Sequence, residues 1–351
     1  MSVLVVVDNS GSMGEEQAAL GPGLGVLAEQ LTTAGIDWRI GFTTTDYGNS
    51  WCQGTGPEAG NLRATSCRSR EASFVFQGAQ TIDAFDEACA NLCPQQWSTI
   101  DIGPQPWVES VGGITNLPAE LSLTDAMSCL APQGINGCGF EQPLRAMRAT
   151  LLREQTPREP AFGFVPDNAL LAVVILTDEA DCSTNSDWEV IFLPEGNRVF
   201  WSDAEAPSPT SAVCWNAGTQ CSGGSCSAAD LDVNANPVSP EAAEDNAVLI
   251  PVAHYADALA EYDHVLFTLI GGVQADGTPV YEPGVDPGFL DEFGIGPGCE
   301  SAAGSAVPPV RMYELANTMA TADAPAAATI CQPSFDSVFS SLGDAIIARV
   351  Q

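Results

Sequence analysis

Residues 3–13 constrain the fold more than any other part of this sequence. A run of five apolar residues, four of them Val, ends at Asp8, and Ser10 and Ser12 follow in a turn that also contains Gly11. A short Val-rich run predicts a buried parallel strand, because parallel strands are covered on both faces. Asp8, Ser10 and Ser12 are hard oxygen donors, which suit Mg²⁺, Mn²⁺ or Ca²⁺ better than zinc or copper. The sequence therefore predicts a divalent-cation site at a strand end.

Helix and strand patterns alternate along the rest of the chain. Leu residues spaced three and four apart predict a helix over 15–34, and alternation predicts a strand over 36–45. The same criteria predict further helices over 142–153, 252–261, 312–319 and 335–347, and strands over 170–176, 265–270 and 327–331. This order predicts an α/β fold with a doubly wound, mostly parallel sheet flanked by helices.

Two irregular segments interrupt this pattern. Residues 46–137 and 183–241 are rich in Cys, Gly, Pro and Ser, and we interpret them as cysteine-rich insertions in a single domain spanning 1–351. Within the first insertion, 74–76 is a short apolar piece and 82–90 is predicted as a helix. The second insertion shows no clear period.

Charge excludes several classes of function. The chain has 45 acidic residues against 11 basic residues, all Arg, and a net charge of -34. Such a field repels nucleic acid and anionic membranes, so neither is an expected partner. The absence of Lys also excludes a P-loop lysine and a Schiff-base lysine. Divalent cations are the natural counter-charges.

The cysteines form an even set of 12, which favours disulfides over a metal site because their spacing matches no zinc pattern. The disulfide candidates are Cys52, Cys67, Cys89, Cys93, Cys129, Cys138, Cys182, Cys214, Cys221, Cys226, Cys299 and Cys331. Disulfides persist in oxidising compartments, so we expect an extracytoplasmic location in the periplasm, at the cell surface or outside the cell. We expect a leader segment outside this chain, and no apolar run approaches the roughly 20 residues that span a membrane.

A second apolar strand also ends in a carboxylate, at Thr177-Asp178. Ligand sites in doubly wound sheets lie beyond the carboxyl ends of the strands, so Asp8 and Asp178 should face one crevice. The sequence Asp8-Asn-Ser10-Gly-Ser12 resembles the metal-ion-dependent adhesion site of von Willebrand factor type A domains. The sequence Leu-Thr177-Asp178 is similar to the distal aspartate motif of that family. The resemblance covers the core segments and leaves out the two insertions.

The resemblance implies a set of cation ligands. The first aspartate and both serines coordinate a divalent ion, a threonine from a middle loop adds a hydroxyl, and the distal aspartate contacts the ion directly or through water. Here Cys138 lies near the threonine position, so either Glu141 or a water molecule takes that place. Glu179 and Asp181 are possible secondary ligands that would shift the preference from Mg²⁺ toward Ca²⁺, although both are also typical of solvated loops. No catalytic residue is predicted.

These features favour a binding or adhesion module that captures a protein or another ligand with an acidic group through the cation, with Mg²⁺ preferred and Ca²⁺ or Mn²⁺ as alternatives. Two other functions stay open. A metal-assisted hydrolase could use the same ion to activate water, and a structural surface protein could use the ion only to stabilise its loops. The sequence does not define the ligand or the oligomeric state.

Overall fold

A seven-stranded sheet forms the centre of the computed structural model, which describes residues 1–78, 80–302, 304–321 and 326–350. The strand order is β13-β10-β7-β1-β2-β5-β6. In that order the strands are Ala327–Thr329, Val265–Gly271, Leu171–Leu176, Ser2–Val7, Trp38–Thr44, Trp107–Val111 and Ile114–Thr115. From β13 to β2 all neighbours are parallel, and β5 and β6 add an antiparallel edge. The predicted α/β class with a mostly parallel sheet is confirmed.

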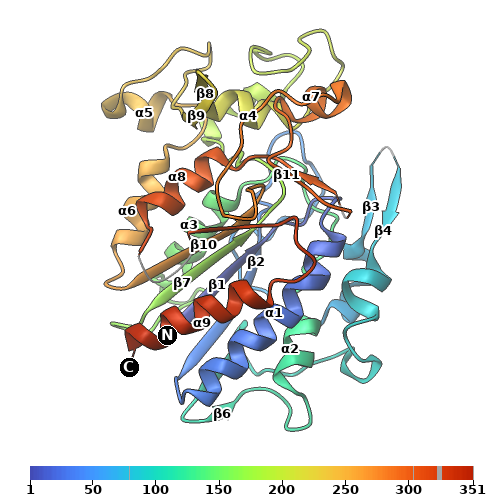
Figure 1. The fold of residues 1–351 in the computed structure, drawn as a ribbon, viewed down its shortest axis with the longest axis vertical. Helices are drawn as coiled ribbons and strands as arrows, with labels where there is room; N and C mark the ends of the chain where they lie inside the picture. Colours follow the sequence, from blue (N-terminus) through green and yellow to red (C-terminus); the bar gives the residue numbers. More distant parts are fainter. Residues whose placement is uncertain (79, 303, 322–325, 351) are drawn as a thin grey trace.

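Helices cover both faces of the sheet (Figure 1). The first face packs against α1 (Gly14–Thr33), α2 (Leu123–Leu130) and α9 (Asp336–Val350). The second face packs against α3 (Pro143–Glu154), α6 (Val252–Ala260) and α8 (Val310–Thr318). The sheet is therefore the middle layer of three, as the alternating pattern predicted.

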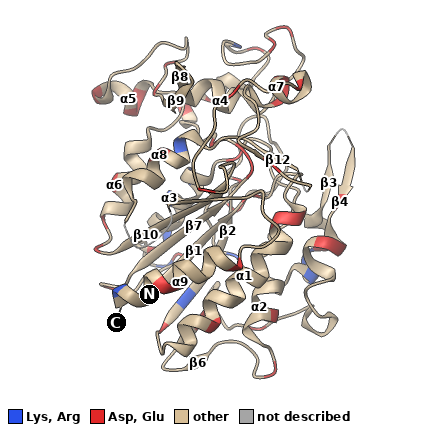
Figure 2. Ribbon diagram, viewed as in Figure 1, with Lys and Arg blue, Asp and Glu red and all other residues tan. Residues whose placement is uncertain are grey.

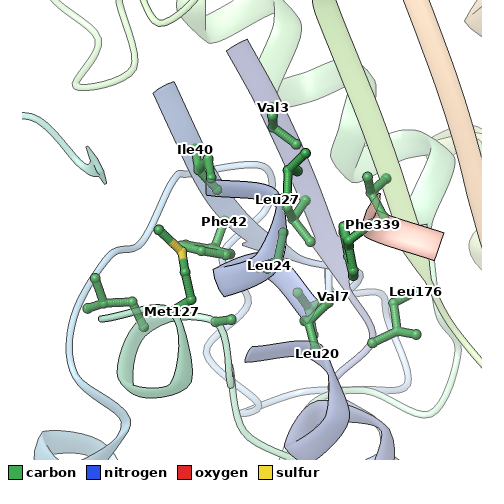
Figure 3. Close-up of a cluster of buried hydrophobic side chains, with 14 of the residues drawn as sticks. Val3, Val7, Leu20, Leu24, Leu27, Ile40, Phe42, Met127, Leu176 and Phe339 are labelled. Carbon is green, nitrogen blue, oxygen red and sulfur yellow. The ribbon is translucent and has the colours of Figure 1, made fainter. Parts of the chain in front are cut away.

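The central strand β1 shows why its sequence is apolar throughout. Val3, Val5 and Val7 face the α1 side, and Leu4 and Val6 face the α3 side, all fully buried. Burying one such side chain stabilises the fold by about 1.5–3 kcal/mol. Figure 3 shows the α1 side, where β1 meets side chains from neighbouring strands and helices, among them Leu20, Leu24, Leu27, Ile40, Phe42, Met127, Leu176 and Phe339.

Two glycines let α1 approach its neighbours closely. A Cβ atom on Gly21 would lie 2.7 Å from the Cα atom of Ser128 in α2, and one on Gly23 would lie 2.6 Å from the ring of Phe339 in α9. Glycine inside a helix costs roughly 0.5–1 kcal/mol relative to alanine. At these two positions the close packing of α1 against α2 and α9 offsets that cost.

The segment 46–137 contributes directly to the three layers. Its strand β5 pairs with β2, and its helix α2 packs on α1. The helix predicted over 82–90 is wrong at its first two residues, since Thr81–Asp83 forms β4 and pairs with β3 (Val75–Gln77) in a hairpin, whereas Asp86–Ala90 is helical. Ile82 pairs across this hairpin and is 43% exposed, so it does not belong to a buried helical face.

The segment 183–241 lies beyond the carboxyl ends of the parallel strands, at the top of Figure 1. It contains α4 (Ala212–Gly218), β8 (Thr219–Ser222), β9 (Ser225–Ala228) and the start of α5 (Pro240–Asn246), and α4 contacts α7 (Pro287–Phe293). An apolar cluster joins this region, which we call the cap, to the loops that follow the strands; its fully or almost fully buried members include Cys138, Phe140, Cys182, Ile191, Phe192, Phe200, Trp201 and Val213. The cap therefore covers the edge at which the predicted site lies.

Short elements complete the described chain. They comprise the helical turns Cys67–Phe74, Asp86–Ala90, Gln95–Trp97 and Ser186–Phe192, and the small hairpin of β11 (Cys299–Glu300) and β12 (Ser305–Ala306). Acidic residues are spread over the helices and the cap, whereas basic residues are scattered singly (Figure 2). Among the described residues, no helix is long and apolar enough to cross a membrane.

Candidate metal centre

The site lies where the direction of the sheet reverses. From β1 the chain proceeds to β2 on one side, and β7, β10 and β13 lie on the other side, so the crevice opens between β1 and β7. Val7 pairs with Leu176 in register, which places Asp8 beside the residues 177–178. Ligands of doubly wound sheets bind at such a reversal. The structure thus brings Asp8 and Asp178 together, although they are far apart in the sequence.

The loop after β1 is held by its own hydrogen bonds. Oδ1 of Asp8 accepts a 2.8 Å hydrogen bond from the N–H of Ser10, and the hydroxyls of Ser10 and Ser12 lie 3.2 Å apart. The buried side chain of Gln17 donates to the carbonyl oxygens of Asp8 and Gly134, both at 2.7 Å. The three predicted oxygen donors therefore share one small turn, and Gln17, which sequence reasoning missed, fixes that turn from the first part of α1.

Thr177 connects the two strand ends. Its hydroxyl donates a 2.5 Å hydrogen bond to Oδ2 of Asp8 and accepts a 3.1 Å hydrogen bond from the N–H of Glu179. The nearby Ser12 hydroxyl lowers the pKa of Asp178, against the larger opposite effect of burial. Asp178 therefore lies beside the serine turn, and its Oδ1 atom is buried without a partner among the described residues.

Glu141 reaches the site from the loop before α3. Its side chain is fully buried, and the hydroxyl of Thr45 donates a hydrogen bond to it. Thr45 directly follows β2, and a signal for it was present in the sequence as three consecutive threonines at the end of a predicted strand. The structure thus supplies a threonine hydroxyl from the end of β2, beside β1, and not from the loop 137–142 in which the sequence predicts the third oxygen donor.

Several carboxyl oxygens in the site have no partner. Oδ1 of Asp178, Oε1 of Glu141 and Oε2 of Glu179 are buried and accept no hydrogen bond within the described part of the chain. A buried charge without a partner is costly. Burial, together with repulsion from Asp8, raises the pKa of Asp178 and of Glu141 well above the ordinary value. Burial also raises the pKa of Asp8 itself, against the hydrogen bond from Thr177.

The two possible secondary ligands differ from the solvated loop residues that the sequence suggested. Asp181 is buried and forms an ion pair with Arg311 of α8, with 2.9 Å between Oδ2 and Nε, and it also accepts from Ser183. Glu179 is 8% exposed, and burial and repulsion from Asp178 raise its pKa well above the ordinary value. The interpretation of both as solvated residues is wrong, because the cap covers this loop. Asp181 is committed to Arg311, whereas Glu179 keeps an oxygen without a partner.

The donor set fits a hard cation that takes hydroxyls as well as carboxylates. Among the described residues, no three His, Cys, Asp or Glu side chains are grouped so as to hold a metal ion by themselves. A cation here would therefore be bound by Asp8 and Asp178 together with the hydroxyls of Ser10 and Ser12, and water would complete the shell. The unpartnered oxygens of Asp178 and Glu141 are the observation that favours such an ion.

A cleft of about 770 Å³ opens above this turn. Ser10, Ser12 and Glu179 line it, and Trp51 and Ile82 are apolar lining residues that are 39% and 43% exposed. None of the described residues that line it is Arg, Lys or His. The cleft therefore reaches the serine turn, and its acidic lining residues are Glu179 and Glu292.

Six disulfides pair all twelve cysteines. The pairs are Cys52–Cys138, Cys67–Cys89, Cys93–Cys129, Cys182–Cys214, Cys221–Cys226 and Cys299–Cys331. The prediction of disulfides is confirmed. Cys52–Cys138 closes the loop beside Glu141, and Cys182–Cys214 ties the loop after β7 to the cap, so both fasten segments that carry site residues.

No protein-family model matches this chain, and no curated protein matches it. The described residues define an α/β protein with a seven-stranded, mostly parallel sheet, helices on both faces and six disulfides. What the chain does is therefore inferred from the site itself.

Proposed function

We propose that this protein is a binding module of the von Willebrand factor type A kind, which captures its ligand through a divalent cation. One observation carries the proposal. Asp8 and Asp178 follow neighbouring parallel strands at the reversal point of the sheet, beside Ser10 and Ser12, and Oδ1 of Asp178 is buried without a hydrogen-bond partner among the described residues. This is the arrangement that the resemblance of the two strand-end motifs implies.

The proposed ion is Mg²⁺, with Mn²⁺ or Ca²⁺ as substitutes. Mg²⁺ favours octahedral oxygen coordination and keeps several waters, which suits two carboxylates, two hydroxyls and an open position toward the cleft. A ligand carboxylate would replace one of those waters. The ion would supply the positive charge that the cleft otherwise lacks, since no described lining residue is basic.

The six disulfides support a location outside the cytoplasm, because disulfides are rare in reducing compartments. Partner specificity would then come from the loops around the cleft, as is usual for sites at strand ends. Trp51 and Ile82 in the lining of the cleft offer apolar contact next to the ion.

Equilibrium dialysis against Mg²⁺ tests the proposal. Asp8→Ala should lose one bound ion per chain relative to the unaltered protein, whereas Glu120→Gln, which changes an exposed carboxylate before α2, should lose none. Equal Mg²⁺ binding by the unaltered protein and Asp8→Ala would exclude the site.

Water-proton relaxation with bound Mn²⁺ tests the open position. Adding acetate should displace a bound water and reduce the relaxation enhancement. No effect of acetate at any concentration would argue against capture of acidic groups and would favour a purely structural ion.

A further inference from the structure

The hairpin of β3 and β4 places an aromatic ring against the turn that carries Ser10 and Ser12. A Cβ atom on Gly11, which lies between the two serines, would be 2.8 Å from Cδ1 of Phe76 and 3.0 Å from its Cγ atom. The ring therefore packs closely on this turn, and Phe76 also lines the cleft. An apolar surface thus begins directly beside the predicted ligands of the cation.

Ile82 continues this surface. It lies directly opposite Phe76 in the hairpin, and opposite residues of an antiparallel pair have their side chains on the same face. Ile82 lines the same cleft, and so does Trp51 from the loop after β2; the two are 43% and 39% exposed. Exposed apolar side chains that gather at one place mark an interaction site, whereas singly scattered ones do not. Large apolar side chains from two separate segments therefore line the cleft next to the serine turn.

The hairpin is anchored at its base, beside the start of α1 (Figure 1). The N–H of Ala84 donates a 3.0 Å hydrogen bond to the carbonyl oxygen of Phe74, and a Cβ atom on Gly14 would lie 2.9 Å from the Cβ atom of Ala84. The disulfide Cys67–Cys89 joins the segments on either side of the hairpin. The apolar surface is thus held in place before a ligand arrives, which reduces the entropy cost of binding.

The charge of the cleft limits which ligands fit. Glu179 and Glu292 line it, no described lining residue is basic, and the chain has a net charge of -34. This field repels a ligand with several acidic groups, whereas a single carboxylate can be held by the ion. The amide side chains of Gln77 and Asn136 also line the cleft and can hydrogen-bond to a peptide backbone. The lining therefore favours a peptide with one acidic residue over a polyacidic segment.

We propose that Phe76, Ile82 and Trp51 form an apolar subsite next to the cation, and that the ligand is a polypeptide segment with one acidic residue flanked by large apolar side chains. The proposal rests on the proposed function, since the ion takes the carboxylate. The cleft of about 770 Å³ has the size of a ligand pocket and exceeds what a carboxylate alone requires. The ion selects for an acidic group, and the apolar subsite selects among acidic groups by their neighbours.

Isothermal titration calorimetry at saturating Mg²⁺ tests the subsite with two capped peptides of equal charge, acetyl-Ser-Phe-Glu-Leu-Ser-amide and acetyl-Ser-Gly-Glu-Gly-Ser-amide. The first should bind at least about tenfold more tightly, because burying one large apolar side chain contributes about that factor. Octanoate, which has a carboxylate and an apolar chain but no peptide backbone, tests a lipid-like acid as the alternative ligand.

Variants locate the preference for the apolar peptide. Ile82→Ser and Trp51→Ser should each lower the ratio of the two dissociation constants toward 1. Ile114→Ser is the matched control, because Ile114 is 76% exposed on the edge strand β6 and does not line the cleft. This control should keep the ratio of the unaltered protein. Circular dichroism checks that every variant is folded.

The outcomes separate the subsite from the proposed function. Equal affinity for the two peptides, no binding of either, or a ratio unchanged in both Ile82→Ser and Trp51→Ser overturns the subsite; acetate that still displaces water from bound Mn²⁺ then leaves the proposed function intact. Octanoate binding as tightly as the apolar peptide overturns the polypeptide ligand. A preference that persists in EDTA and is lost in Ile82→Ser supports the subsite and contradicts capture through the cation.

Discussion

The hydroxyl of Thr177 lies 2.5 Å from Oδ2 of Asp8 and donates to it, so the ends of β7 and β1 are joined directly at the candidate site. Oδ2 of Asp8 accepts this hydrogen bond, and Oδ1 accepts one from the N–H of Ser10. Each oxygen keeps a further lone pair for a cation. The bond orients the carboxylate and leaves it able to act as a ligand.

Asp8→Asn keeps the shape of the side chain and removes its charge. Without divalent ions the variant should be at least as stable as the unaltered protein at neutral pH, because repulsion with Asp178 and Glu141 is removed. With Mg²⁺ at 100 times its dissociation constant, the unaltered protein should gain about 2.7 kcal/mol and the variant almost nothing. Urea unfolding with and without Mg²⁺ measures both effects. Equal Mg²⁺ stabilisation of the two proteins would contradict a role for Asp8.

The stability of the ion-free protein should fall as pH rises. The pKa values of Asp8, Asp178 and Glu141 are raised on folding, mainly by burial. Carboxyls with raised pKa values contribute stability that is fully present below their unfolded pKa, about 4, and is lost as pH rises through the folded values. With EDTA present, we expect a lower Tm at pH 7.5 than at pH 5.5.

Mg²⁺ should reverse this trend, because the ion binds the ionised carboxylates. The increase in Tm on adding Mg²⁺ should be larger at pH 7.5 than at pH 5.5. An equal or larger increase at pH 5.5 would be inconsistent with an ion held by these carboxylates.

Arg311→Met should destabilise the fold strongly. It leaves Asp181 buried without its 2.9 Å partner, and breaking a buried pair in this way costs about 3–5 kcal/mol. Arg39→Met is the matched control, because the pair Arg39–Glu109 is 24% exposed on each side and should contribute at most about 1 kcal/mol. Urea unfolding compares the two variants. Similar losses of unfolding free energy in Arg311→Met and Arg39→Met would contradict a larger contribution from the buried pair.

Gly21→Ala should weaken the packing of α1 on α2. The added Cβ would lie 2.7 Å from the Cα atom of Ser128, and overpacking of this kind costs about 1–3 kcal/mol. Gly139→Ala is the control, since a Cβ there meets no atom within 4 Å. Thermal unfolding of both variants, each without Mg²⁺, measures the difference. A higher Tm for Gly21→Ala would show that α1 and α2 can move apart to accommodate the methyl group without loss of stability.

Replacing both Cys52 and Cys138 by Ser should weaken the site as well as the fold. The disulfide links residues 86 apart and holds the loop next to Glu141, and losing a native disulfide typically costs about 2–5 kcal/mol. The same change at Cys221 and Cys226, only 5 apart in a hairpin of the cap, should cost less and leave Mg²⁺ affinity unchanged. Mg²⁺ titration measures the affinity of both double variants. Unchanged Mg²⁺ affinity after the loss of Cys52–Cys138 would show that the loop next to Glu141 keeps its position without the disulfide.

The strand ends could be predicted because an uninterrupted apolar run precedes Asp8 and another precedes Thr177-Asp178, and the structure buries both runs fully. The contact of Thr45 with Glu141 could not be predicted in this way. It depends on β2 lying beside β1, which local periodicity does not encode. The burial of Asp181 also depends on a distant element, since Arg311 comes from α8. The helix predicted over 82–90 began too early, because Ile82 and Asp83 pair with β3, a contact that local sequence does not encode.

A crystal structure with Mn²⁺ in place of Mg²⁺ tests the central claim most directly, because the anomalous signal locates the ion. The account predicts an anomalous peak at the ends of β1 and β7, within coordination distance of Asp8, Ser10 and Ser12 and bound to Asp178 directly or through water. The absence of a peak at this place, in crystals that contain Mn²⁺ at saturating concentration, would contradict it.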